Sequence, residues 1–244
     1  MAQQREVQGT SQRDNDPRWT KADEFGAQNL ITKASSPIYE ALQYAEELRR
    51  KEGLPDIAVS PLQGKFLALQ CKLIGAKNAL EVGTLAAYST LFIASSSPEI
   101  NVVSVEIDEH KKSVSEKVIA HAGLNDRVQV RLGAGIDVLP KLKEEIEAGK
   151  REKFDFTFID ADKQNNTNYL KLATEMSRSG ACIIVDNVVR RGLVADVEAA
   201  EKDSKVAGSR EVVEFAGRDG RLDCTMIQTV GEKNYDGFLM CVVK

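Results

Sequence analysis

Residues 158–163 read FIDADK and residues 183–187 read IIVDN, so in both places a β-forming apolar run ends abruptly in acidic or amide side chains. A buried parallel strand is a continuous hydrophobic run. In open α/β sheets, ligands bind beyond the carboxyl ends of such strands. Asp160, Asp186 and Asn187 are therefore predicted to place oxygen donors at one rim of a sheet. Such oxygens suit a hard cation such as Mg²⁺, and Lys163 follows Asp160 by about one helical turn.

Segments with strand and helix character alternate from residue 78 onward. The predicted strands cover residues 78–82, 102–107, 128–132, 154–159 and 182–185. The predicted helices cover residues 88–95, 111–122, 136–147, 167–177 and 193–204. This alternation predicts an α/β fold with a mostly parallel sheet, right-handed crossovers and helices on both faces. Two last strand-like runs, 223–230 and 237–243, flank a polar turn at 231–234, which predicts an antiparallel hairpin.

The amino-terminal part precedes this alternation. Residues 1–19 are rich in Gln, Arg, Asp, Asn and Gly and are predicted to form a flexible arm. A helix is expected from Ser36, which can cap it, with Pro37 at the first helical position and Gly53 near its end. A second helix is expected after Pro61. Since no repeat or linker interrupts the remainder, residues 20–244 are predicted to form a single domain.

Composition limits the classes of protein that the chain can belong to. Its 244 residues carry a formal net charge of −4, with 42% hydrophobic and 29% charged residues, an ordinary globular mixture. The acidic balance argues against a nucleic-acid partner. No apolar run is long enough for a transmembrane helix, and residues 1–20 lack the apolar segment of a secretory signal, so no membrane partner is expected. Four scattered cysteines without a C-x-x-C pair indicate reduced thiols and a cytoplasmic location.

The first predicted strand leads into a possible cofactor loop. Residues 79–84 read ALEVGT, and Gly83 allows the backbone to approach a ligand closely. The later glycines of the dinucleotide motif G-x-G-x-x-G are missing, so a cofactor with a nucleoside but no diphosphate fits better. Glu106, at the end of the second strand, is placed to bind ribose hydroxyls, the alternative being a solvated strand end. Together with Asp160 and Asp162, these residues predict a site for S-adenosylmethionine.

From about residue 57 to the C-terminus, the chain resembles the cation-dependent O-methyltransferases of the caffeoyl-CoA and catechol type. The matching segments are SPLQGKFL at 60–67, LEVGT at 80–84 with Tyr88 and Ser89, RLGA at 131–134, IDADK at 159–163 with Tyr169, and DN at 186–187. The chain departs from the plant enzymes at 190–192, where RRG stands in place of Trp-Asn-Gly. Leu62 and Gln63 likewise replace an acidic pair. Both departures resemble the bacterial and fungal branch.

The resemblance implies a class I methyltransferase (Rossmann-like) fold, with a seven-stranded sheet whose last strand is antiparallel, and a homodimer. It also implies S-adenosylmethionine and Mg²⁺, or another divalent cation such as Mn²⁺ or Ca²⁺. Carried over by position, the cofactor-binding residues would be Val59, Glu81, Gly83, Thr84, Ser89, Glu106, Ala134 and Asp162. The metal ligands would be Asp160, Asp186 and Asn187. Lys163 corresponds to a lysine proposed as general base, and with Asp160 it forms the catalytic pair. The alternative is a surface lysine that pairs with Asp162.

The sequence therefore predicts an S-adenosylmethionine-dependent and metal-dependent O-methyltransferase. Its acceptor would be a small vicinal-diol phenolic, such as a catechol, a caffeoyl compound or a flavonoid. Arg190 and Arg191 could meet an acidic acceptor group or be solvated loop residues. The alternatives are a methyltransferase acting on RNA, a protein or another non-catechol acceptor, and a non-catalytic cofactor-binding homologue. A nicotinamide-dependent dehydrogenase would need the missing glycines and would leave Asp186 and Asn187 unexplained.

Overall fold

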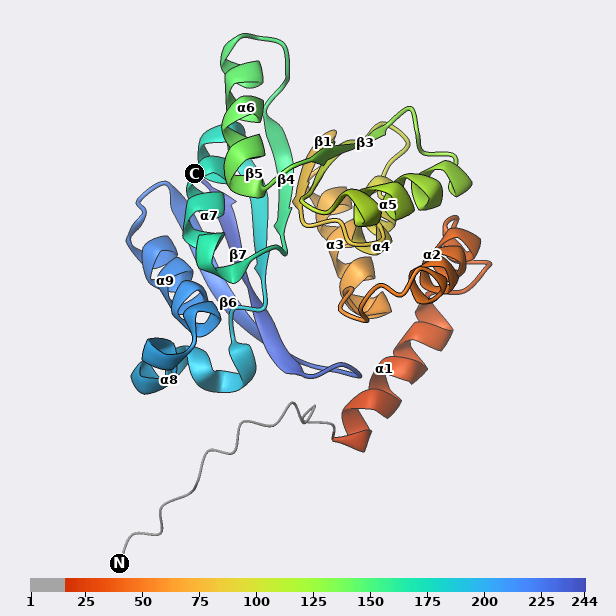
Figure 1. Ribbon diagram of the computed structural model, residues 1–244, viewed down its shortest axis with the longest axis horizontal. Helices are drawn as coiled ribbons and strands as arrows, with labels where there is room; N and C mark the ends of the chain where they lie inside the picture. The colour runs from red at the N-terminus through yellow and green to blue at the C-terminus, as the bar shows by residue number, and fades with distance from the viewer. Residues whose placement is uncertain (1–15) are drawn as a thin grey trace, which may run out of the picture.

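The computed structural model describes residues 16–244. Its strands form one seven-stranded sheet in the order β3-β2-β1-β4-β5-β7-β6 (Figure 1). The strands are β1 (Asn78–Val82), β2 (Asn101–Glu106), β3 (Val128–Leu132), β4 (Phe154–Ile159), β5 (Ser177–Asp186), β6 (Leu222–Val230) and β7 (Tyr235–Val243). Strands β1 to β5 are parallel, whereas β7 lies between β5 and β6 and runs antiparallel to both. The predicted sheet and its final hairpin, with the turn at 231–234, are confirmed.

Helices cover both faces of this sheet. They are α1 (Pro17–Leu30), α2 (Tyr39–Lys51), α3 (Pro61–Leu73), α4 (Tyr88–Ala94), α5 (Glu109–His121), α6 (Gly135–Glu147), α7 (Asn166–Met176), α8 (Val197–Lys202) and α9 (Ser204–Arg218), with short 3₁₀ segments η1 (Lys163–Asn165) and η2 (Arg190–Ala195). Helices α2 to α5 pack on one face, and α6, α7 and α9 pack on the other (Figure 1). Between residues 16 and 244, no helix combines the length and apolarity needed to cross a membrane.

The strands supply both cores by alternating their side chains. Phe158 packs with the first core, under α2 to α5, and its neighbour Ile159 packs with the second, under α6, α7 and α9. Ile184 and Val185 of β5 divide in the same way. Because successive strand residues face opposite sides, a continuous apolar run is what a strand covered on both faces requires. Asp160 and Asn187 follow where β4 and β5 leave the core.

The structure differs from the expected helices at the amino-terminal end. Residues 1–15 of the predicted arm lie outside the described residues, but α1 begins within that arm at Pro17, where the Asp16 carboxylate accepts the Arg18 N–H. Ser36 does not cap the next helix: α2 begins at Tyr39, and Ser36 lies in the preceding turn, where its carbonyl accepts the Tyr39 N–H. The prediction of a Ser36 cap is therefore wrong.

The predicted helix over residues 193–204 is correct only in its middle part, α8. Residues 193–195 belong to η2, which contains left-handed backbone at Arg190, Arg191 and Gly192, and extended backbone at Asp196 and Asp203 bounds α8 on both sides. The carboxylates of Asp196 and Asp203 then each cap a new helix start, the second being that of α9. Helix α9 was not predicted, although it covers much of the second core.

Candidate functional site

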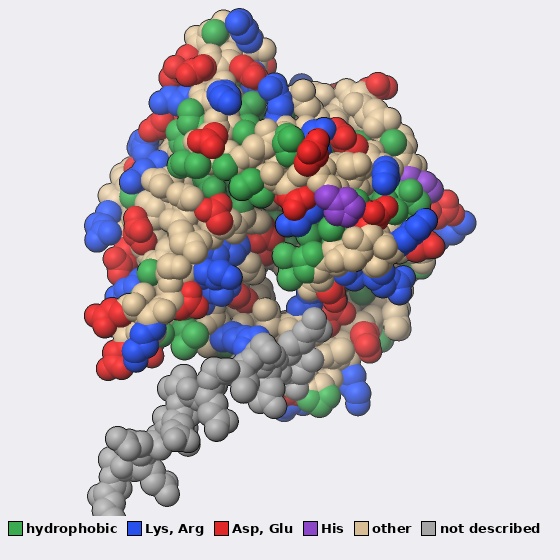
Figure 2. Space-filling view, in the orientation of Figure 1, with side chains coloured by type: hydrophobic (Ala, Val, Ile, Leu, Met, Phe, Trp, Pro, Cys, Tyr) green, Lys and Arg blue, Asp and Glu red, His purple; other side chains and the backbone are tan. Residues whose placement is uncertain are grey.

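A cavity of about 880 Å³ lies where the parallel strands end. Its walls are the segments that follow β1, β3, β4 and β5, together with the end of β2, and Figure 2 shows a hollow near the centre of one molecular face with basic and acidic side chains around it. From the predicted cofactor set, the lining contains Val59, Gly83, Thr84, Ser89, Glu106, Ala134 and Asp162. Glu81 alone of that set lies outside the lining.

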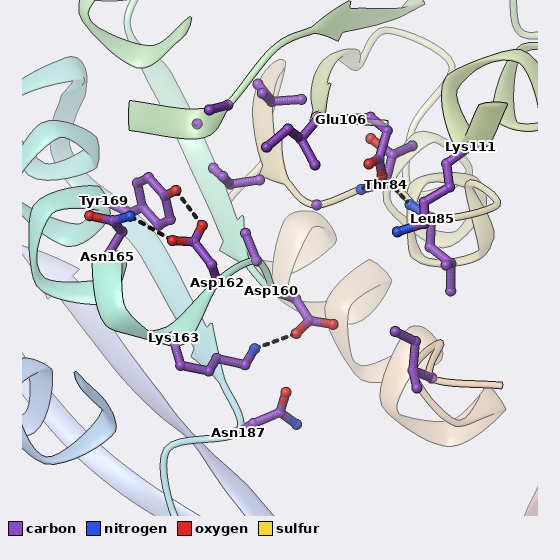
Figure 3. A pocket seen from close by; sticks show the side chains of 18 of the residues that line it. Thr84, Leu85, Glu106, Lys111, Asp160, Asp162, Lys163, Asn165, Tyr169 and Asn187 are labelled. Carbon is purple, nitrogen blue, oxygen red and sulfur yellow. Dashed lines mark hydrogen bonds and ion pairs between the residues drawn. The ribbon is translucent and has the colours of Figure 1, made fainter. Parts of the chain in front are cut away.

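Glu106 stands at one end of this cavity (Figure 3). Its Oε2 accepts the backbone N–H groups of Thr84 and Leu85 at 3.3 and 2.9 Å, and its Oε1 accepts the Asp108 N–H at 3.0 Å. These bonds orient the carboxylate. Since each carboxylate oxygen can accept two hydrogen bonds, Oε2 is already saturated and Oε1 keeps one free lone pair. Glu106 is thus a rigid acceptor for a hydroxyl group of a ligand.

Gly83 holds the β1 and β4 loops together at the floor of the cavity. Its φ is 100°, and a Cβ at this position would lie 2.2 Å from the carbonyl oxygen of Asp160. The Asp160 N–H in turn donates to the carbonyl of Val82 at 2.8 Å. Only glycine permits this approach, so the glycine that the sequence suggested for a cofactor also positions the residue that follows β4.

Glu81 is completely buried beneath the cavity. Its carboxylate accepts hydrogen bonds from the hydroxyls of Ser89, Thr90 and Ser104, at 2.6, 2.5 and 2.6 Å. Burial raises the pKa of Glu81 to about 7, against the lowering effect of these hydroxyls. The structure therefore places Glu81 behind Ser89, which lines the cavity itself.

Asp162 is held by two residues that sequence reasoning did not assign to the site. Its Oδ1 accepts the Tyr169 hydroxyl and its Oδ2 accepts the Asn165 amide, both at 2.5 Å (Figure 3). Burial, and next the hydrogen bond to Asp162, raise the pKa of Tyr169. Asn165 and Tyr169 both line the cavity. Of Asn165 and Tyr169, only Tyr169 was marked by the sequence, as one of the residues that carry the family resemblance.

Asp160 and Lys163 lie in direct contact at the other end of the cavity from Glu106 (Figure 3). The Nζ of Lys163 is 2.6 Å from Oδ1 of Asp160, and Lys163 is only 8% exposed. Lys163 therefore pairs with Asp160. The alternative of a surface lysine that pairs with Asp162 does not match this geometry. Asn187, with a left-handed φ of 58°, extends toward the same place.

Asp186, the last residue of β5, completes the predicted metal set. Its Oδ1 accepts the Asn187 N–H at 2.9 Å. Burial and the nearby charge of Asp160 raise the pKa of Asp186 to about 7, while Lys163 opposes that shift. Within residues 16–244, no three His, Cys, Asp or Glu side chains gather as a metal site, and the predicted set instead holds two carboxylates and one amide.

This donor set fits a divalent cation. Two carboxylates face one ammonium group, so the group carries excess negative charge when both acids are ionised. A buried charge of this kind is costly unless it is paired or coordinates a metal. Carboxylate and amide oxygens are the ligands that Mg²⁺, Mn²⁺ and Ca²⁺ prefer.

A second cavity, of about 630 Å³, adjoins the first. The two share Val59, Asn187 and Arg190 among their lining residues. Its apolar part includes Phe66 and Phe238, whose rings lie 5.0 Å apart. Its size and its apolar walls suit a small aromatic ligand.

The rim of the second cavity comes from segments far apart in the chain. Helix α1 contributes Asp23, whose carboxylate accepts the Glu232 N–H of the β6–β7 turn at 2.9 Å. In the same turn, the Nζ of Lys233 is 2.8 Å from the carboxylate of Asp56. Sequence reasoning missed these residues because α1 was not predicted and the turn was assigned no role.

The sheet and its two adjoining cavities define a Rossmann-like α/β enzyme that brings a cofactor and a second small molecule together. The chain belongs to the O-methyltransferase family, whose model matches residues 32–242. It is 47% identical over 229 residues to O-methyltransferase imqG from Aspergillus flavus, which covers 94% of this chain and 92% of that protein. It is 43% identical over 206 residues to a catechol O-methyltransferase from Niastella koreensis, with 84% and 90% covered.

A solved structure agrees with these relatives. The O-methyltransferase from Bacillus cereus, determined in complex with SAH, superposes with a TM-score of 0.85 at 42% identity, over 93% of this chain and 99% of that one. The predicted family, the enzyme class and the class I methyltransferase fold are therefore confirmed.

Proposed function

We propose that this enzyme transfers a methyl group from S-adenosylmethionine to one hydroxyl of a catechol-type phenol, with the aid of a divalent cation. The observation that carries the proposal is the separation of two polar groups in one cavity: Glu106 at one end, and Asp160 with Lys163 and Asn187 at the other. The relative named as a catechol O-methyltransferase and the SAH held by the Bacillus cereus enzyme support it.

The cofactor would lie along the ends of β1 to β4. Glu106 would accept a hydrogen bond from a ribose hydroxyl, and Gly83, Thr84 and Ala134 would line the path of the nucleoside. Asp162, held by Tyr169, would face the amino-acid part. S-adenosylmethionine supplies a methyl group on a positively charged sulfur, so carboxylates around it also balance its charge.

Asp160, Asp186 and Asn187 would hold the divalent ion. A divalent ion held by these residues would supply positive charge that favours the ionised form of a phenol. Lys163 lies 2.6 Å from Asp160, within reach of a hydroxyl held at the same place. The ammonium form pairs with Asp160, and only the neutral amine, after it has released its own proton, could accept the proton that this hydroxyl loses. Holding acceptor and methyl donor in adjoining cavities turns their encounter into an effectively unimolecular step.

An assay with labelled cofactor tests the proposal. The protein is incubated with methyl-labelled S-adenosylmethionine and caffeic acid, with and without Mg²⁺. We expect label on the phenol oxygen only when Mg²⁺ is present. Label on no catechol, or label transferred instead to a protein acceptor, would contradict the proposal. The non-catalytic alternative is disfavoured because Asp160 and Lys163 are present and in contact.

We further propose that the enzyme is a cytoplasmic homodimer. Strand β6 is an edge of the sheet and exposes the large apolar side chains Met226, Ile227 and Val230. An unpaired apolar edge is a surface that proteins usually cover. Light scattering after gel filtration should report twice the chain mass of 26.8 kDa, and a single-chain mass would contradict the dimer.

A further inference from the structure

Arg190 lies on the wall that the two cavities share. Its guanidinium Nε is buried and has no hydrogen-bond partner in the part of the chain that the structure describes. Within the same residues, no ion pair joins Arg190 to an acidic side chain. Leaving a buried charged donor unsatisfied costs free energy, so such a group is expected at a place where a ligand supplies the acceptor.

The neighbouring acid does not satisfy this guanidinium. Asp236 is 6% exposed, and its Oδ1 accepts three backbone N–H groups, from Val189, Arg190 and Gly237, at 3.1, 2.9 and 2.9 Å. Asp236 therefore binds the backbone of the loop. These bonds hold the Arg190 backbone in its left-handed conformation, with φ of 53°. The Arg190 charge opposes the rise that burial causes in the pKa of Asp236, but no hydrogen bond joins the guanidinium to this carboxylate within residues 16–244.

Two further acids of the second cavity have partners of their own. Asp23 accepts the Glu232 N–H, and Asp56 pairs with Lys233. Arg191 differs from Arg190 because it is exposed and lines only the second cavity. Arg190 thus lines both the cavity that holds Asp160 and the cavity that holds Phe66 and Phe238.

We propose that Arg190 binds a carboxylate of the methyl acceptor, so that the acceptor is an aromatic acid bearing a vicinal diol. This inference rests on the proposed function. The diol would lie near Asn187, which both cavities share, and the ring between the apolar walls, with its carboxylate turned toward Arg190. A guanidinium suits this role because its planar donors match a carboxylate in two parallel hydrogen bonds.

Two acceptors that differ only in charge test the assignment: caffeate and its primary amide. We expect the wild-type enzyme to prefer caffeate. Arg190→Ala should lower kcat/KM for caffeate by about 10- to 100-fold, mainly through KM, because a hydrogen bond to a charged group is lost. The same variant should leave kcat/KM for the amide nearly unchanged. Arg190→Lys should recover part of the loss, since it restores the charge without the planar donors.

Controls separate this effect from general ones. Arg218→Ala removes an equal charge from a side chain 73% exposed and outside both cavities, and should not alter the preference for caffeate. Calorimetric binding of SAH should match the wild type in Arg190→Ala and Arg190→Lys, which shows that both variants fold.

Three results would overturn the inference. They are an equal loss for caffeate and amide in Arg190→Ala, no loss for either, or loss of the preference in Arg191→Ala alone. A wild-type enzyme that methylates neither acceptor would refute the proposed function itself, and this inference with it.

Discussion

At the scale of single residues, Glu81 shows how a carboxylate can serve the site without facing it. Buried charges are costly, and three hydroxyls only partly offset this cost, so the pKa of Glu81 is raised to about 7 from 4.5. Its hydrogen bond to Ser89 fixes the first turn of α4 beside the cavity. The sequence placed Glu81 in a strand end, but which side of the strand it faces follows from the sheet.

The raised pKa predicts a pH dependence of stability. Between about pH 4.5 and 7 the unfolded chain has released the Glu81 proton and the folded chain still holds it, so the free energy of unfolding falls as the pH rises. Glu81→Gln removes this pH-dependent contribution to the free energy of unfolding. Between pH 5 and 8, the free energy of unfolding should therefore fall by about 2–3 kcal/mol less in the variant than in the wild type. Urea unfolding at both pH values measures the difference.

The exposed Glu47→Gln provides the control, and its stability should follow the wild-type pH curve. Parallel curves for wild type and Glu81→Gln would show that the folded-state pKa of Glu81 is close to its ordinary value.

In the proposed mechanism, Lys163 is the residue that takes the proton of the acceptor hydroxyl. Lys163→Ala should lower kcat by about 10²- to 10⁴-fold at neutral pH, because a positioned base is lost. The loss should shrink as the pH approaches about 10, where a free phenol ionises without help. Initial rates across this pH range, together with SAH affinity, measure the effect. A constant deficit at every pH would assign Lys163 to the structure of the Asp160 loop instead.

At the scale of elements, helix α9 positions the segment that carries Lys163. A Cβ at Gly208 would lie 2.2 Å from the carbonyl oxygen of Lys163 and 2.9 Å from Cα of Gln164, both backbone atoms. Gly208→Ala must therefore displace η1. We expect a loss of stability of about 1–3 kcal/mol and a clear fall in kcat with SAH binding retained.

Gly217 offers a matched control in the same helix, since a Cβ there meets nothing within 4 Å. Gly217→Ala should stabilise the protein by about 0.5–1 kcal/mol and leave kcat unchanged. Thermal unfolding and initial rates compare the two variants. Equal kcat in both would show that α9 does not position Lys163.

The elements that could be predicted from the sequence are those whose pattern is local. The carboxyl-terminal parts of β4 and β5 are largely apolar and lead into acids, so these parts and the rim that they build were predictable, whereas the polar first residues of β5 (177–180) were not assigned to the strand. The break after Val189 was not, because it depends on Asp236, which lies 47 residues further along the chain. The contribution of α1 to the second cavity could not be predicted for the same reason, because it depends on a turn far away in the chain.

At the scale of the whole molecule, the fold brings two predicted binding sets to one edge of the sheet. Glu106 ends β2, whereas the predicted metal ligands lie where β4 and β5 end: Asp160 follows β4, Asp186 is the last residue of β5 and Asn187 follows it. The two carboxylates Asp160 and Asp186 lie near enough for the charge of one to raise the pKa of the other, and Lys163 opposes that shift. The molecule thus keeps a costly charge cluster, as sites that bind a cation do at the expense of stability.

This arrangement predicts that metal and cofactor can be removed separately. In excess EDTA, turnover should be lost while SAH still binds with its affinity nearly unchanged, because Glu106 and the loop after β1 do not depend on the ion. Added Mg²⁺ should restore the rate. Asp186→Asn should be inactive in Mg²⁺, yet at least as stable as the metal-free wild type, since it relieves the repulsion between two buried carboxylates. Calorimetry, initial rates and thermal unfolding measure the three quantities. Full turnover in EDTA, or full activity of Asp186→Asn, would show that the oxygens after β4 and β5 hold no catalytic ion.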